Sequence, residues 1–403
     1  MAKVLIFSPN AIGKSMAGAS IRAVEFAKAL SDEHDVITIS KDTPGYKEHF
    51  KNADVLIAQR LTFPLALLVK KHGLKVIIDA YTPGPLELLE HFKDAPLKKR
   101  SEKVDAEITN LHFSFKMANG ILCATERQKD LWAGFLLGQK WVDLSLKNLF
   151  AIVPFGLSST PPKKNGKGLR EIFGFSTEDK VLLWGGGIWN WFDPLTLIKA
   201  MKIVSQARKE IKLVFMGVTP PDPKLPRTSR AQDAVRLAEE LNLIGRSVFF
   251  NFEWVPYEER VNFLLDADMG VSTHFNHLET RFSYRTRMLD YIWAGLPMIA
   301  TEGDAFAEII AKNELGLVVP YQDEQALALA ILSLVDNCQK ITPRVLAMRE
   351  RFYWDHVTRP LKKMIHGLSD QHQKIKCSTL LHFFISKLRE RGLKACLARG
   401  FRK

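Results

Sequence analysis

The stretch that decides the fold is HLETRFSYRTRMLDYIWAGLPMIAT, residues 277–301. It combines a charged loop, one short helix that stops at Gly295, and an apolar strand that begins at Met298. A helix followed directly by an apolar strand is typical of α/β sheets with helical crossovers. The charged groups of the loop and the first helical turns are Arg281, Arg285, Arg287, Glu279 and Asp290.

This stretch suits a ligand that carries both phosphate and sugar hydroxyls. A helix N-terminus carries positive partial charge, and arginine offers forked donors that match phosphate. A carboxylate can accept hydrogen bonds from hydroxyl groups. We therefore expect a nucleotide-diphospho-sugar here. Arg285 and Arg287 are predicted to act catalytically by stabilising the departing diphosphate, and Glu279 to bind the hydroxyls of the donor sugar.

The same alternation of strand and helix extends outward along most of the chain. Its apolar runs are continuous, as expected for parallel strands that are covered on both faces. The pattern predicts an α/β fold with two doubly wound, Rossmann-like units. The predicted strands are 4–9, 35–40, 54–59, 75–80, 120–125 and 151–156 in the first half, and 181–187, 212–217, 247–255, 269–275, 297–301 and 315–320 in the second.

A linker rich in proline, glycine, serine and lysine, SSTPPKKNGKG (158–168), separates the two halves. Ligands bind off the carboxyl ends of such strands, so we expect the site in a cleft between the two domains. The predicted parts are an acceptor-side domain (1–157), a linker (158–175), a nucleotide-sugar-binding domain (176–345), a helix packing back on the first domain (346–365) and a basic amphipathic tail (366–403).

Composition limits the class of protein. Hydrophobic residues make up 46% of the chain and charged residues 25%, which is ordinary for a soluble globular protein. No apolar run approaches the ~18 residues of a membrane span, and the N-terminus MAKVLIFSPN indicates a strand rather than a signal peptide. The four cysteines show no CxxC spacing, which argues against a metal site or a disulfide framework. We expect a cytoplasmic protein that needs no metal and no cofactor.

The positive charge is concentrated at the C-terminus. The chain carries +13, and residues 361–403 hold seven lysines and four arginines against two acidic residues, or +9. Anionic lipid and nucleic acid are the candidate partners, and confinement to a terminal segment argues against nucleic acid. The apolar and basic side chains of the tail fall largely on different helical faces, as in helices that lie peripherally on membranes. Docking on the protein's own surface and disorder stay open.

The segment TRMLDYIWAGLPMIAT (286–301) resembles the donor site of GT-B glycosyltransferases, specifically family 4 of the retaining enzymes. Weaker likenesses lie in MAGASIRAVEFAKALS (16–31), CATERQ (123–128) and VPFG (153–156), so the resemblance covers residues 1–365. It implies two Rossmann-like domains that face each other across a cleft, and transfer with retention from a nucleotide sugar. It also implies that Asp290, where the family usually has glutamate, binds the ribose.

Two departures from the family pattern change the expected site. The position eight before Asp290 is Phe282, where the family has a second glutamate; either Glu279 takes over the sugar contact or the contact is absent. The family also carries basic residues after the first strand of its second domain. Here none lies between Gly185 and Lys199, so phosphate neutralisation is expected to have moved to the arginines.

Further candidate residues follow from loop positions. Gly186 and Gly187 end a strand and allow a ligand to approach the backbone. Gly18 lies where the first loop becomes a helix, a natural anion-facing position. Asp79 follows a buried strand and is a candidate catalytic or acceptor-orienting residue, with a structural role as the alternative. The remaining donor-binding candidates are Phe282, Ser283 and Thr286.

The leading hypothesis is thus a glycosyltransferase of hexosyltransferase type. Its acceptor would be a glycan or a lipid-linked molecule in cell-envelope or polysaccharide biosynthesis, since a basic tail suits a membrane-borne acceptor. Two alternatives stay open: a nucleotide-sugar epimerase of the same architecture, and a basic nucleic-acid-binding protein.

Overall fold

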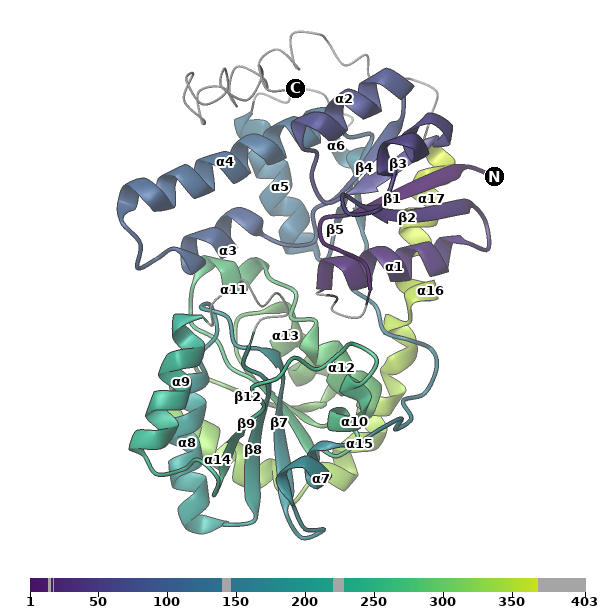
Figure 1. Ribbon diagram of the computed structural model, residues 1–403. Helices are drawn as coiled ribbons and strands as arrows, with labels where there is room; N and C mark the ends of the chain where they lie inside the picture. Colours follow the sequence, from purple (N-terminus) through teal and green to yellow (C-terminus); the bar gives the residue numbers. More distant parts are fainter. Residues whose placement is uncertain (14–15, 17, 140–145, 220–227, 369–403) are drawn as a thin grey trace. The chain divides into compact units, whose positions relative to one another are not determined.

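The computed structural model describes residues 1–13, 16, 18–139, 146–219 and 228–368. The chain forms two compact units, which are described separately (Figure 1). Unit 1 consists mainly of residues 1–154 and takes up the chain again at Thr358. Unit 2 consists mainly of Phe155–Val357.

Unit 1 is built on a six-stranded sheet in the order β2-β1-β3-β4-β5-β6. All its strand pairs are parallel. Every residue of β3 and β5 is buried, as expected for strands with helices on both faces. The strands are β1 (Lys3–Ser8), β2 (Asp35–Ser40), β3 (Val55–Ala58), β4 (Lys75–Asp79), β5 (Gly120–Cys123) and β6 (Phe150–Ile152).

Local signals set the ends of the unit 1 helices. Thr125 accepts a hydrogen bond from the N–H of Gln128 and so begins α5, and α2 ends at Gly73, whose φ of 68° is left-handed. Phe115 and Trp132 from the helices join the core beneath the strands. The elements are α1 (Gly18–Leu30), η1 (Tyr46–Asn52), α2 (Phe63–His72), α3 (Gly84–His91), α4 (Leu97–Lys116), α5 (Glu126–Gly138), α6 (Leu146–Leu149) and α17 (Arg359–Gly367).

Unit 2 repeats the design with the strand order β12-β11-β10-β7-β8-β9, again all parallel. Sequence order reverses between β7 and β10, which is the switch point where doubly wound sheets bind ligands. The strands are β7 (Lys180–Gly187), β8 (Ile211–Gly217), β9 (Val248–Phe250), β10 (Met269–Ser272), β11 (Met298–Thr301) and β12 (Gly316–Val319).

Side-chain caps begin five of the unit 2 helices. Each cap accepts a hydrogen bond from an N–H three residues on; the caps are Asp193, Thr228, His277, Asp304 and Asp323. The elements are α7 (Leu169–Phe173), α8 (Pro194–Ala207), α9 (Ser229–Glu240), α10 (Arg260–Leu264), α11 (Leu278–Phe282), α12 (Arg287–Ala294), α13 (Ala305–Asn313), α14 (Glu324–Val335), α15 (Cys338–Ala347), η2 (Arg349–Phe352) and α16 (Trp354–Val357).

The predicted α/β fold with two doubly wound units is confirmed. Several strands are shorter than predicted, and two of them end at least four residues early. The strand predicted over 247–255 ends at Phe250, because the Asn251 side chain donates to the carbonyls of Met216 and Glu253 and turns the chain. The strand predicted over 151–156 ends at Ile152. The following carbonyls, including that of Pro154, accept hydrogen bonds from a buried arginine instead of a strand.

Within the described ranges, no helix combines the length and the apolar character that a membrane crossing requires. The predicted basic tail lies outside the described residues from position 369 on, so the three possibilities for it stay predictions.

Candidate functional site

The candidate site lies in unit 2, at the carboxyl ends of β7 and β10 where the strand order reverses. β7 ends in Gly185-Gly186-Gly187, and its pairing with β8 shifts register between Trp184 and Gly187. Gly186 has a φ of 91°, which a residue with a side chain rarely adopts. The turn therefore presents backbone rather than side chains beside the N-terminus of α12.

Arg287 opens α12 and reaches into this turn. Its Nη2 donates to the carbonyl of Gly187 at 2.8 Å, and its guanidinium lies over the rings of Trp184 and Phe192, with centroids at 4.5 and 4.0 Å. The side chain is buried, and Nη1 has no hydrogen-bond partner among the described residues. Burial lowers the pKa of Arg287 to about 10, so the group stays charged at neutral pH.

No carboxylate of the described chain lies within ion-pair distance of Arg287. A buried charge without a partner costs free energy, and proteins normally pair such charges. Arg287, which the sequence analysis predicted to bind phosphate, thus has no acidic partner among the described residues of unit 2.

Arg285, in contrast, already has an acidic partner. Its Nη1 and Nη2 donate to Oε1 and Oε2 of Glu279, each at 2.7 Å, in a forked pair that is almost fully buried. Its Nε faces Oδ2 of Asp304 at 3.9 Å. The two residues that the sequence assigned to different parts of the ligand therefore bind each other in this conformation.

The neighbouring positions of the loop are occupied as follows. The hydroxyl of Ser283 donates to the carbonyl of Thr280 at 3.1 Å and is buried. Thr286 precedes α12 and makes no side-chain cap, and Phe282 ends α11; both are half-buried. Asp290 lies one turn into α12, where its side chain is 30% exposed.

Asp290 has a partner that sequence reasoning missed. Nε of Arg260 donates to Oδ1 of Asp290 at 3.0 Å. The Arg260 guanidinium lies between the rings of Tyr257 and Trp293, with centroids at 3.5 and 4.9 Å. The negative charge of Asp290 raises the pKa of Arg260, against a lowering by burial. The pair fixes one carboxylate oxygen, and no donor from the described residues reaches the other.

Comparison with known proteins agrees with this geometry. Residues 179–337 match the family described as Glycosyl transferases group 1. These residues therefore resemble a group 1 glycosyl transferase domain. The match contains the glycine turn, the Glu279–Arg285 pair, Arg287 and Asp290, and no curated protein matches the chain closely enough to add to it.

The whole fold is that of GT-B glycosyltransferases. HepE of Anabaena, solved with UDP and glucose, has a TM-score of 0.65 at 14% identity and is matched over 91% of this chain and 100% of its own. Sucrose-phosphate synthase of Thermosynechococcus elongatus gives 0.64 at 15%, over 91% and 99%. WaaG, a glycosyltransferase involved in lipopolysaccharide biosynthesis, gives 0.58 at 15%, over 90% and 98%.

Two predicted site residues precede the residues that match the glycosyl transferase family. Gly18 begins α1. Asp79 ends β4, and both its carboxylate oxygens accept from Arg22, at 2.7 and 2.8 Å. Arg22 also donates to the carbonyls of Val153 and Pro154. The geometry favours the structural role for Asp79, because its carboxylate holds Arg22, and Arg22 joins α1 to β4 and to the chain beyond β6.

Sequence reasoning also missed Asp304, the N-cap of α13. Its Oδ1 accepts from the N–H of Ala307 at 2.8 Å. Burial raises the pKa of Asp304 to about 6, although the nearby positive charge of Arg285 lowers it. Only the N-cap pattern of the sequence could have signalled this residue, because its ion-pair partner lies 19 positions away in the preceding loop.

The two histidines of this region form hydrogen bonds with the backbone. Nε2 of His274 lies 3.0 Å from the carbonyl of Glu302, and Nδ1 of His277 accepts from the N–H of Thr280. Burial keeps the pKa of His274 well below its ordinary value.

Proposed function

We propose that this protein transfers a sugar from a nucleotide-diphospho-sugar and that Arg287 neutralises the diphosphate. The observation that carries the proposal is a buried guanidinium without a carboxylate partner, at the switch point of a group 1 glycosyl transferase domain. A bound diphosphate supplies the missing counter-charge and accepts the unused N–H of Nη1. Arginine suits this task because its donors match phosphate oxygens.

The proposed chemistry breaks the bond between the sugar and the diphosphate. The sugar becomes oxocarbenium-like, and the departing oxygen gains negative charge. Arg287 and the N-terminus of α12 stabilise that charge, which is where electrostatic catalysis acts. The free oxygen of Asp290 is placed to accept hydrogen bonds from a ribose, while Gly186 and Gly187 allow the ligand close to the backbone. No metal is needed for these steps, because Arg287 carries the positive charge.

The acceptor and the outcome are also part of the proposal. We infer transfer with retention to a glycan or lipid-linked acceptor, in cell-envelope or polysaccharide biosynthesis, by a cytoplasmic protein. Residues 366–403 would hold it against an anionic membrane. The resemblance to family 4 supports retention, and the charge of the tail supports the membrane. The epimerase alternative needs a histidine that reaches the sugar, and backbone hydrogen bonds already engage both His274 and His277.

Titration calorimetry of the full chain with UDP-glucose tests the donor site. This donor is the first probe because HepE of Anabaena was solved with it. Arg287→Ala should weaken binding by at least about tenfold, which corresponds to about 1.4 kcal/mol. Arg281→Ala is the matched control, because Arg281 is exposed on the neighbouring helix α11. Equal affinity of wild type and Arg287→Ala for every nucleotide sugar that binds would overturn the assignment.

A further inference from the structure

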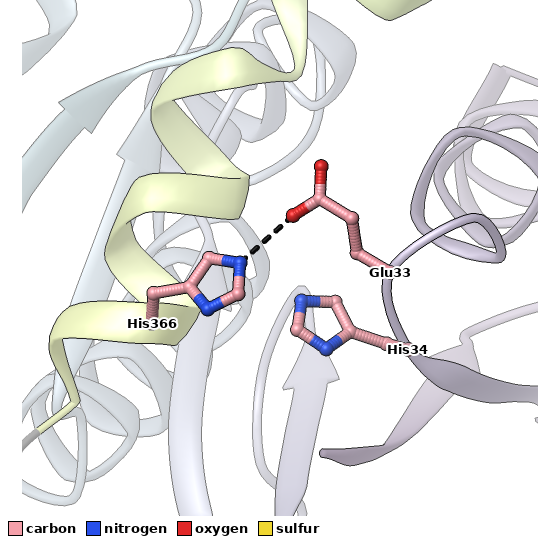
Figure 2. A group of neighbouring side chains, drawn as sticks. All are labelled: Glu33, His34 and His366. Carbon is pink, nitrogen blue, oxygen red and sulfur yellow. Dashed lines mark hydrogen bonds and ion pairs between the residues drawn. The ribbon is translucent and has the colours of Figure 1, made fainter. Parts of the chain in front are cut away.

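A cluster of two histidines and one glutamate joins the turn after α1 to helix α17, as Figure 2 shows. Glu33 and His34 lie in the turn between α1 and β2, and His366 lies in the last turn of α17. Nε2 of His366 is 2.8 Å from Oε2 of Glu33, and the rings of the two histidines lie 5.0 Å apart. One ligand atom from each of the three residues falls within 4.8 Å of the other two.

An ion pair between Glu33 and His366 does not account for the position of His34. The residue is 4% exposed, and its Nε2 has no hydrogen-bond partner among the described residues. In Figure 2 this nitrogen points toward Glu33 and His366. Nδ1 accepts a long hydrogen bond, 3.4 Å, from the N–H of Ala2. Proteins seldom bury a ring nitrogen without a partner.

Charged groups flank the cluster. Nζ of Lys362 contacts Oδ2 of Asp32 at 2.7 Å and Oε1 of Glu33 at 3.0 Å. These two carboxylates face one ammonium group, and the N-terminal amino group also acts on His34. Lys362 holds Oε1 of Glu33 and leaves Oε2 directed at His366. An outer partner of this kind commonly orients a carboxylate ligand.

We propose that Glu33, His34 and His366 bind a divalent transition-metal ion of the zinc type, which fastens α17 to the turn after α1. Two imidazole nitrogens and one carboxylate oxygen form a set that suits Zn²⁺, with water in the fourth position. Ligand atoms bound to zinc at about 2.0–2.2 Å lie roughly 3.4 Å apart in a tetrahedron. Small rotations of the exposed Glu33 and His366 side chains close the remaining distance. Nε2 of His34 can bind the ion only when the ring proton is on Nδ1, so metal binding would break the long hydrogen bond from Ala2.

The proposed metal site is distinct from the proposed donor site. All three ligands belong to unit 1, and none is a predicted donor or catalytic residue. The expectation of no metal rested on the spacing of cysteines, whereas this cluster joins residues 333 positions apart and has no sequence spacing to detect. The ion would act as a structural clasp, because metal bound to the native state stabilises it by mass action.

Titration calorimetry with ZnCl₂ tests the clasp on the full chain after treatment with a chelator. Wild type should bind Zn²⁺ in one tight step, and Glu33→Gln and His366→Ala should each weaken it by at least about tenfold. His72→Ala, at the end of α2, is the matched control and should bind like wild type. Equal zinc affinity in wild type, Glu33→Gln and His366→Ala, or no binding at all, would overturn the proposal.

Two further readouts separate the clasp from general damage. Co²⁺ should give visible absorption bands of a tetrahedral complex in wild type and not in His366→Ala. Zn²⁺ should raise the melting temperature of wild type and leave that of His366→Ala unchanged. UDP-glucose affinity should be the same in wild type and Glu33→Gln. Failure of the clasp therefore leaves the donor proposal intact, and failure of the donor proposal leaves the clasp intact.

Discussion

Tyr291 lies so close to Gly270 that a β-carbon on the glycine would come within 2.4 Å of the tyrosine ring. Through this contact, α12 packs closely against β10. The tyrosine hydroxyl accepts from the N–H of Gly185 at 2.7 Å and lies 2.8 Å from the carbonyl of Leu183 on β7. One side chain thus links the helix that carries Arg287 to both strands of the switch point.

Gly270→Ala should therefore destabilise unit 2. The added methyl group cannot fit without moving the Tyr291 ring, and overpacking of this kind costs about 1–3 kcal/mol. Denaturant unfolding of wild type and variant measures the loss, and UDP-glucose binding should fall with it, because α12 shifts. Gly174→Ala is an unsuitable control because its φ is 69°; Gly134→Ala has open space and an ordinary helical backbone. A Gly270→Ala protein as stable as wild type would show that the ring is free to move.

The fold of unit 2 could be predicted because its signals are local. Continuous apolar runs mark strands that are buried on both faces, and Asp193 and Asp323 cap helices that begin at the next residue. The reversal of strand order, which decides where the site lies, follows from pairing between distant strands and has no local signal.

The sequence pointed to candidate residues for the site, but the side chains that these residues bind in the structure could not be predicted from it. Arg260 meets Asp290 from 30 positions away, and Arg22 meets Asp79 from 57, so sequence spacing could not have paired them. Glu279 and Arg285 are only six apart. Opposite charges at that distance in one loop are a local signal for such a pair. The sequence pattern instead predicted that Arg285 binds the diphosphate and Glu279 the donor sugar.

Replacing Arg287 with an apolar residue should abolish ligand binding without lowering stability. Its buried charge has no carboxylate partner, so Arg287→Met removes an unpaired charge and keeps most of the apolar contact with Trp184 and Phe192. We expect the free energy of unfolding without ligand to stay within about 1 kcal/mol of wild type or to rise. UDP-glucose binding should be lost, whereas Arg287→Lys, which keeps the charge but not the fork, should retain part of it.

Denaturant unfolding and calorimetry on the same three proteins check this prediction. A large loss of stability in Arg287→Met, with binding intact, would indicate that the Gly187 hydrogen bond is structural and that Arg287 serves the fold alone.

Arg22→Met should cost about 3–5 kcal/mol of stability. It leaves the Asp79 carboxylate buried without its forked partner and strips the carbonyls of Val153 and Pro154 of donors. Asp79→Asn should be destabilising for the same reason. The double variant Arg22→Met, Asp79→Leu should recover part of the loss, since it buries no charge. A catalytic Asp79 would behave differently: Asp79→Asn would lower kcat and leave unfolding unchanged.

Asp304 should make stability depend on pH in an unusual direction. Its pKa is about 6 in the folded protein against an ordinary 3.8, so the folded state holds a proton between these values that the unfolded state has released. Stability contributed by this group is therefore fully present below about pH 4 and is lost as pH rises through 6. A shift of about two pKa units corresponds to about 3 kcal/mol.

Asp304→Asn isolates this contribution, because asparagine keeps an oxygen for the N–H of Ala307 and removes the titrating proton. The stability of the variant relative to wild type should rise between pH 4 and pH 7 by about 2–3 kcal/mol. Denaturant unfolding at several pH values measures the difference, in which other titrating groups cancel. Removing this negative charge, which lies 3.9 Å from Arg285, should also strengthen UDP-glucose binding above pH 6. A constant difference across the whole range would mean that the pKa of Asp304 is not raised and that Arg285 compensates its burial fully.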